Sequence, residues 1–230
     1  EATGRGVSYV TLEALQHLKL DVSKATVAVQ GFGNVGSNTA LIMQQAGARV
    51  VAVSDVGGGL YNPKGLDIAD VLHRYRDKHE PLREIKLGES ISNEELLQLD
   101  CTVLVPAALS EQITHANASK LRCRILAEGA NGPTTLEADR ILTDKGVFII
   151  PDILANSGGV IVSYFEWVQD VQRFFWKAKD IQDRLQDIIT SAFHRTLQFS
   201  VEKRTTMRMA ALMSGIDKVA QAHLQRGLYP

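Results

Sequence analysis

The sequence has few features of a disulfide-stabilised, zinc-binding or membrane protein. It contains only two cysteines, Cys101 and Cys123. Each opens a short apolar run, which indicates buried thiols in a reducing compartment and not a disulfide framework. The six histidines are scattered singly, without the spacing of zinc ligands. We therefore expect no metal site and a cytoplasmic location.

Long apolar runs and an imbalance of charge are also missing. No stretch approaches the roughly 20 apolar residues that a membrane-spanning helix needs, and no signal-peptide pattern opens the chain. The formal net charge is -1, which provides no general attraction for nucleic acid or an anionic membrane. These absences leave a globular protein with small-molecule partners as the expected class.

Strand-like and helix-like segments alternate along most of the chain. Capping-box patterns start two of the helices, at Ser92 with Glu95 and at Thr134 with Glu137. The alternation predicts an α/β fold in which a doubly wound parallel sheet carries helices on both faces. After residue 158 only helical periodicity is present. The expected strands are 26–30, 49–53, 101–105, 125–127 and 147–150, and the expected helices include 6–20, 34–46 and 66–78.

A glycine motif joins the first expected strand to the following helix. Its sequence is Gly31-Phe32-Gly33-Asn34-Val35-Gly36, which matches G-x-G-x-x-G in a strand–turn–helix context. The first glycine permits a tight turn, the second admits a pyrophosphate, and the third allows close packing of helix on sheet. The alternative is a glycine-rich turn without a ligand. We predict a Rossmann-type dinucleotide-binding domain over 1–155, with its first helix within 1–20, and a helical extension over 156–230.

An acidic residue ends the second expected strand. Asp55 lies 24 positions after Gly31, close to the spacing at which an acid accepts a hydrogen bond from the ribose 2′-hydroxyl. A carboxylate there repels a 2′-phosphate, so NAD is favoured over NADP as the cofactor. The alternative is that Asp55 only caps the glycine-rich loop at 57–59.

Three further loops follow strands that share the carboxyl edge of the sheet, where ligands bind in open α/β folds. Ala107 lies in the first loop, Asn131 in the second and Asn156 in the third. An amide side chain can both donate and accept, which suits a nicotinamide carboxamide or a substrate carbonyl. The alternative is that each asparagine forms a turn or caps a helix. We include all three residues among the cofactor-binding candidates.

Four segments of the chain carry a resemblance to a known family: 1–6, 31–36, 127–135 and 151–160, continued by 163–167. Together they resemble the glutamate dehydrogenase group of the Glu/Leu/Phe/Val dehydrogenase family. The resemblance implies that Thr3 and Asn131 contact the nicotinamide carboxamide, that Asn156 lies near the nicotinamide and substrate, and that Ser163 binds the side-chain carboxylate of glutamate. From the residues alone, Thr3 could instead cap a helix and Ser163 could be an exposed helical serine.

The resemblance also implies an activity and a missing partner domain. Family members oxidatively deaminate L-glutamate to 2-oxoglutarate and ammonium, and assemble as hexamers. An upstream substrate domain supplies a catalytic lysine and aspartate, and we find no candidate for either here. Because the chain opens at Glu1 without a methionine, we expect an excised cofactor domain that binds dinucleotide without turnover. Its helices after Gly158 would pack towards the missing domain.

Two other functions are compatible with these residues. The parent enzyme could act on leucine, phenylalanine or valine, since those relatives share the fold and the glycine motif. The segment 132–135 and Ser163 resemble the glutamate type more closely. Alternatively, the chain could be a stand-alone module that senses dinucleotides.

Overall fold

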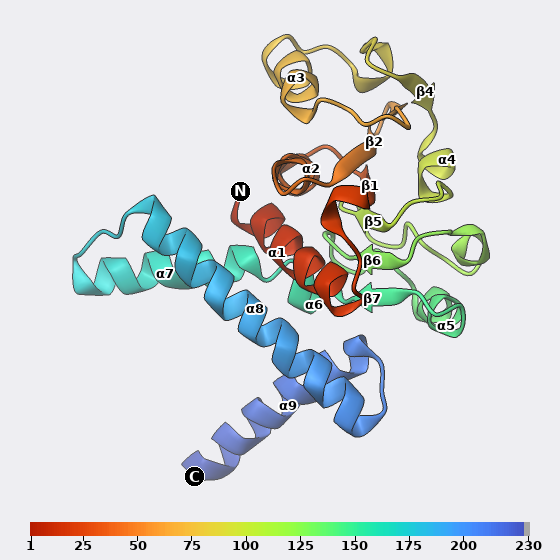
Figure 1. Cartoon of the computed structure of the whole chain (residues 1–230). Helices are drawn as coiled ribbons and strands as arrows, with labels where there is room; N and C mark the ends of the chain where they lie inside the picture. Colours follow the sequence, from red (N-terminus) through yellow and green to blue (C-terminus); the bar gives the residue numbers. More distant parts are fainter. Residues whose placement is uncertain (228–230) are drawn as a thin grey trace.

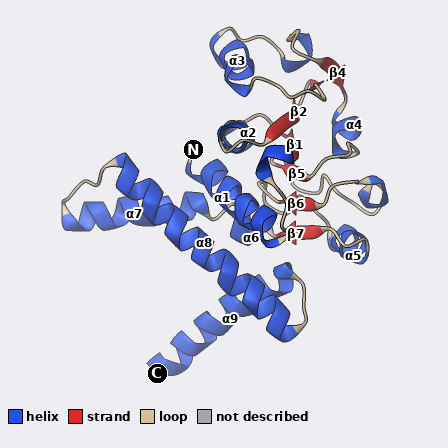
Figure 2. Cartoon of the chain, viewed as in Figure 1, coloured by secondary structure: helices blue, strands red, loops and turns tan. Residues whose placement is uncertain are grey.

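The short β-branched runs form a central sheet, and the periodic segments form helices around it (Figures 1 and 2). The computed structural model describes residues 1–227. The strands are β1 Thr26–Gln30, β2 Arg49–Asp55, β3 Gly58–Tyr61, β4 Glu89–Ile91, β5 Val103–Pro106, β6 Ile125–Ala127 and β7 Phe148–Ile150. The α-helices are α1 Ala2–His17, α2 Asn34–Gln45, α3 Ile68–Leu72, α4 Asn93–Leu97, α5 Leu136–Asp144, α6 Asp152–Ala155, α7 Gly158–Gln172, α8 Ala178–Lys203 and α9 Met207–Arg226.

The order of the strands identifies where a ligand can bind. The sheet runs β4-β3-β2-β1-β5-β6-β7, with β2, β1, β5, β6 and β7 parallel to one another. The chain starts in the middle with β1, builds outwards through β2, and then returns to the other side of β1 with β5. The edge between β1 and β5 is therefore the topological switch point, where the loops diverge and leave a crevice.

Helices cover both faces of the sheet, so the expected doubly wound α/β architecture is confirmed (Figure 1). On one face Val27 and Val29 of β1 join a core with α1, α2 and α8. On the other face Ala28 joins a core with α4 and α5. Burial on both faces explains why the strands read as continuous apolar runs without polar alternation.

The sheet is mixed, which corrects the expectation of a wholly parallel one. β3 pairs antiparallel with β2, and β4 pairs antiparallel with β3. The glycine-rich segment 57–59, expected to be a loop, contains the start of β3. Glycine is a poor strand former, so only the tertiary pairing of Gly59 with Ser54 makes this segment a strand.

Several helix starts also differ from the sequence predictions. α1 begins at Ala2 and ends at His17, where 6–20 was expected. Its early glycines lie at helix crossings, since a β-carbon on Gly6 would meet Gly158 of α7. The helix expected over 66–78 is α3 from Ile68, continued by a π-helical turn over 73–77. Thr135, not Thr134, caps α5 by accepting a hydrogen bond from the Ala138 amide, whereas the capping box of Ser92 and Glu95 is present as predicted.

The two cysteines lie buried just before β5 and β6 and form no disulfide. Burial raises the pKa of the Cys101 thiol and raises that of Cys123 to about 12. Both thiols therefore stay protonated near neutral pH, and protonated thiols are poor nucleophiles. They fill space in the second core, as expected.

The C-terminal part is helical, and α8 crosses the α1 face of the sheet (Figure 2). Ile189 and Phe193 of α8 are fully buried in the same core as Val7 and Val10 of α1. The Phe193 ring lies 6.4 Å from the Phe148 ring of β7. Across residues 1–227, none of the helices is long and apolar enough to cross a membrane.

Replacing Phe193 by alanine tests whether α8 is part of the domain core. We expect a loss of about 3–5 kcal/mol in the free energy of unfolding, because the cavity would lie inside a packed core. The control is Phe175→Ala, since Phe175 is 81% exposed and its removal should change stability by less than about 0.5 kcal/mol. Urea unfolding followed by circular dichroism measures both. Equal losses in the two variants would show that α8 contributes no core packing.

Candidate functional site

The three glycines of the motif have different surroundings, which fit a close approach of backbone to a ligand. Gly31 has a φ of +92°, and a β-carbon there would meet the Ala107 carbonyl oxygen at 2.7 Å. A β-carbon on Gly36 would overlap the Gly31 carbonyl oxygen, whereas one on Gly33 would meet nothing within 4 Å. Gly31 and Gly36 are therefore required by packing. Gly33 leaves open space, where a phosphate can approach.

The N-terminus of α2 is available for an anion. Its N-cap is Gly33, and no side chain of the described residues caps it. The amides of the first turn, at Asn34, Val35 and Gly36, precede the first intrahelical bond, which Ser37 makes to Gly33. Such amides and the helix dipole favour a phosphate group. The Phe32 side chain lies in the core, 1% exposed, so only its backbone can face a ligand.

Asp55 lies at the end of β2, on the far side of the glycine turn from β5. Its Oδ1 accepts a hydrogen bond from the Gly57 amide at 2.7 Å, so it does cap the turn to β3. Burial, followed by the negative charge of Asp55 and a hydrogen bond to it, raises the pKa of the Tyr75 hydroxyl. A carboxylate can accept about four hydrogen bonds, so the bonds from Gly57 and Tyr75 leave acceptor capacity for a ribose, and both interpretations of Asp55 are compatible.

Two residues near Asp55 were missed by the sequence analysis. The Asn93 side chain donates to the Asp55 carbonyl oxygen at 2.8 Å and accepts from Ser54 Oγ at 2.7 Å, which fixes the end of β2. Arg76 donates to Ser37 Oγ of α2 at 2.6 Å. Asn93 lies inside the predicted capping box and Arg76 inside a predicted helix, but neither pattern indicates a contact with the glycine turn or with Asp55.

Asn131 and Asn156 meet at the carboxyl edge of the sheet. The Asn156 Nδ2 atom donates to Asn131 Oδ1 at 2.6 Å, although the two residues come from the loops after β6 and β7. They line a cleft of about 630 Å³ together with Val35 of α2 and residues of the loop that follows β5. Thr3, Val35, Ala107, Ala108, Leu109, Ser110, Gly129, Ala130, Gly159 and Val160 complete its lining.

Thr3 reaches this cleft because α1 crosses the start of α7 at two glycines. A β-carbon on Gly158 would overlap the Ala2 carbonyl oxygen, and one on Gly159 would meet Thr3 Oγ1 at 2.6 Å. The Thr3 hydroxyl therefore lies beside α7. Thr3 is inside α1, whose N-cap is Glu1, so the alternative of Thr3 as a helix cap is wrong.

The structure brings five of the twelve predicted site residues into one cleft. Thr3, Val35, Ala107, Asn131 and Asn156 share the cleft. The other five residues of the glycine motif lie outside its lining: Gly31, Phe32, Gly33, Asn34 and Gly36. Asp55 lies at the neighbouring strand end and lines no part of that cleft. Ser163 is exposed on α7, one turn beyond Val160, and also lies outside the lining.

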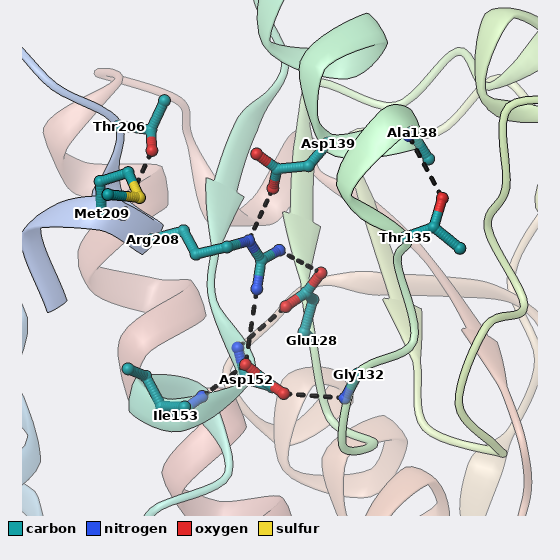
Figure 3. Close-up of polar contacts among 10 residues, drawn as sticks. All are labelled: Glu128, Gly132, Thr135, Ala138, Asp139, Asp152, Ile153, Thr206, Arg208 and Met209. Carbon is teal, nitrogen blue, oxygen red and sulfur yellow. Dashed lines mark hydrogen bonds and ion pairs between the residues drawn. The ribbon is translucent and has the colours of Figure 1, made fainter. Parts of the chain in front are cut away.

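An ionic cluster supports the loops that carry the two asparagines (Figure 3). Arg208 of α9 forms ion pairs with Glu128, Asp139 and Asp152. Glu128 comes directly after β6 and is fully buried, and Asp152 opens α6. The sequence analysis noticed the loop of Glu128 but had no means to find Arg208, which lies 80 residues later.

The comparison with known families agrees with this geometry. The family described as Glutamate/Leucine/Phenylalanine/Valine dehydrogenase matches residues 1–227. A glutamate dehydrogenase of Thermotoga maritima is 49% identical over the whole chain, which corresponds to 55% of that protein. The cryptic catabolic NAD-specific glutamate dehydrogenase GudB of Bacillus subtilis is 46% identical over 98% of the chain and 52% of its own length. The chain thus spans about half the length of the curated relatives it matches.

Solved structures give the same result. The hetero-hexameric glutamate dehydrogenase of Thermus thermophilus in its Leu-bound form superposes with a TM-score of 0.93 at 33% identity, covering 100% of this chain and 54% of the other. The glutamate dehydrogenase of Peptoniphilus asaccharolyticus superposes with a TM-score of 0.84 at 33% identity, covering 99% and 53%. With its match over residues 1–227, the chain belongs to the Glutamate/Leucine/Phenylalanine/Valine dehydrogenase family.

Proposed function

We propose that this chain is the cofactor-binding part of an NAD-dependent glutamate dehydrogenase. The observation that carries the proposal is the amide pair of Asn131 and Asn156, 2.6 Å apart in a cleft at the switch point of the sheet. A cleft with two convergent amides next to an uncapped helix N-terminus suits a ligand with an anionic centre and a carboxamide end.

The residues present fit an extended dinucleotide. The pyrophosphate would lie over Gly33 and the first turn of α2, where a β-carbon would meet open space. The nicotinamide would enter the cleft, where Thr3, Asn131 and Asn156 offer a hydroxyl and two amides to its carboxamide. Ala107 and the backbone of the motif residues Gly31, Phe32, Asn34, Val35 and Gly36 would form the surface under it.

Asp55 supports a preference for NAD over NADP. One carboxylate oxygen caps the turn at Gly57, and the other would accept from a ribose 2′-hydroxyl. A 2′-phosphate would meet this negative charge. Arg76 provides a nearby positive charge, since both Asp55 and Arg76 influence the pKa of Tyr75. The preference for NAD therefore requires that repulsion of the 2′-phosphate by Asp55 exceed its attraction by Arg76.

For the complete protein we propose reversible oxidative deamination of L-glutamate. The names of the relatives support this substrate. When bound, the nicotinamide supplies the hydride acceptor. This chain's contribution is to hold that ring in one orientation, which keeps it close to the substrate in a geometry that allows hydride transfer. We propose that the catalytic acid and base lie in a part of the protein outside this chain. Within this chain, we propose that Ser163 faces the glutamate side-chain carboxylate. We also propose that the complete protein is a hexamer in the cytoplasm.

Titration with NADH and NADPH, followed by nicotinamide fluorescence, tests the proposal directly. We expect saturable binding of NADH and weaker binding of NADPH. A paired assay for glutamate oxidation should show no turnover by these 230 residues alone. If neither dinucleotide binds to the intact protein, the cleft has another ligand and the proposal is wrong.

Two glycine variants separate ligand contact from packing. In Gly33→Ala the new methyl group would occupy the open space above the turn, and Gly33 has an extended backbone that alanine tolerates. We expect unchanged stability and at least about 10-fold weaker NADH binding, equivalent to about 1.4 kcal/mol. In Gly36→Ala the methyl group would overlap the Gly31 carbonyl, so stability should fall by about 1–3 kcal/mol. Thermal unfolding and NADH titration measure both, and tight NADH binding by Gly33→Ala would contradict the placement of the pyrophosphate.

Replacing Asp55 by asparagine tests the cofactor preference. The amide oxygen can still cap the Gly57 turn, but the negative charge is lost, so the NADPH to NADH affinity ratio should rise about tenfold, equivalent to about 1.4 kcal/mol. In the double variant Asp55→Asn/Arg76→Met this gain should disappear, because no cation remains to attract the 2′-phosphate. An unchanged ratio in the single variant would show that Asp55 serves only the turn.

A further inference from the structure

The guanidinium of Arg208 bridges three segments that are distant in sequence (Figure 3). Its Nη2 lies 2.7 Å from Glu128 Oε1, its Nε lies 2.8 Å from Asp139 Oδ1, and its Nη1 lies 3.5 Å from Asp152 Oδ1. Asp139 belongs to α5, while Glu128 and Asp152 begin the two loops that follow β6 and β7. One side chain of α9 thus contacts both loops that end at the cleft.

Short hydrogen bonds connect this cluster to the two asparagines. Glu128 Oε2 accepts from the Asp152 amide at 2.9 Å, and Asp152 Oδ2 accepts from the Gly132 amide at 2.8 Å. Gly132 is the residue after Asn131. On the other side, the Asp152 carbonyl oxygen accepts from the Asn156 amide at 2.9 Å. Asp152 therefore connects Arg208 to the backbone amide of Asn156 and to that of Gly132, the residue that follows Asn131.

The electrostatics make this arrangement depend on Arg208. Glu128 is fully buried, and the other members of the cluster are less than one-fifth exposed. Burial opposes the charge of Arg208, but the hydrogen bonds and charges of Glu128 and Asp139 prevail and raise its pKa. Without Arg208, a buried carboxylate would lose its cation, which is costly in a low-dielectric interior. Glu128 would then take up a proton or the loops would move to bring water to it, and either change removes the ionic link between the loops.

Arg208 also links the loops to the position of α9. It lies in the first turn of α9, next to Met207, and Met207 and Ala210 are the buried residues of this helix. Thr206 caps the turn by accepting from the Met209 amide. The start of α9 is thus the part of the helix that packs against β7 and α8, and the Arg208 side chain reaches from there to the loops.

We propose that Arg208 is a positioning residue for the nicotinamide end of the bound cofactor, an inference that rests on the proposed function. By pairing with Glu128 and Asp152 together, it fixes the separation of the two loops and keeps the amides of Asn131 and Asn156 in register. The adenosine end would lie elsewhere, beside Asp55 at the end of β2, which is fixed by hydrogen bonds from Gly57 and from Asn93 of α4. The influence of Arg208 should therefore be confined to one half of the ligand.

Two ligands that differ only at the nicotinamide test this confinement in the intact protein. NADH has the ring, whereas ADP-ribose has the same adenosine, pyrophosphate and second ribose without it. In Arg208→Met we expect NADH affinity to fall about tenfold, with ADP-ribose affinity unchanged and a lower fluorescence of bound NADH. The matched control is Arg226→Met at the far end of α9, which should leave both affinities as in the unaltered protein. Equal losses for both ligands, or no loss of NADH affinity, would overturn the proposal.

Further variants separate positioning from simple destabilisation. In Glu128→Gln/Arg208→Met the buried carboxylate is neutral, so stability should recover while NADH affinity stays low. In Arg208→Lys the charge is kept but one ammonium cannot span three carboxylates, so NADH affinity should recover only in part. Recovery of full NADH affinity in the double variant would show that Arg208 acts through stability alone. If the unaltered protein binds ADP-ribose and NADH equally well, or binds neither, the proposed nicotinamide site itself is wrong. That result differs from an Arg208→Met variant that keeps full NADH affinity, which would contradict only the role of Arg208.

Discussion

Close contact between backbones is the constraint on which the rest of this structure depends. The turn at Gly31 lies against Ala107 of the β5 loop, α2 starts against the same turn at Gly36, and α1 crosses α7 at Gly6 and Gly158. A side chain at any of these glycines would separate segments that now touch. Because these positions are glycines, the loops after β1 and β5 and the start of α7 can lie together at one edge of the sheet. The cleft is the space that these contacts enclose, so its shape is determined by packing and not by its lining residues.

The sequence was a good guide to every feature that is local or periodic. The strands of the parallel part, the glycine turn and the capping box at Ser92 could be predicted because each depends on a few neighbouring residues. β3 was missed because Gly58 and Gly59 have little intrinsic preference for a strand and form one by pairing with β2. β4 was missed because it has only three residues, Glu89–Ile91, and is a strand through its pairing with β3. α1 was placed too late for the same reason, since its glycines are explained only by helices that cross it.

The candidate site also has features that the sequence predicted and others that it could not. Strand-end logic predicted that Asn131 and Asn156 share an edge, because parallel strands deliver their following loops to the same side. It could not predict their direct hydrogen bond, nor the cluster beneath them. Arg208 lies 80 residues after Glu128, and nothing near it in sequence distinguishes it from other helical arginines. Long-range charge pairing has no periodicity, so it can be recognised only when the fold has placed α9 beside β7.

These two kinds of support have different consequences for function. Glycine contacts are rigid, because they consist of backbone against backbone and leave no alternative arrangement. They hold the turn at which a pyrophosphate would bind, a group common to all dinucleotides. The ionic cluster consists of side chains from three segments, and its geometry changes if α9 moves. It supports the loops for the reactive ring, whose orientation determines whether hydride transfer can occur. On the proposed binding mode, the pyrophosphate would therefore contact the part of the site that is held by backbone contacts. The nicotinamide would contact loops whose support depends on the position of α9, a helix outside the sheet.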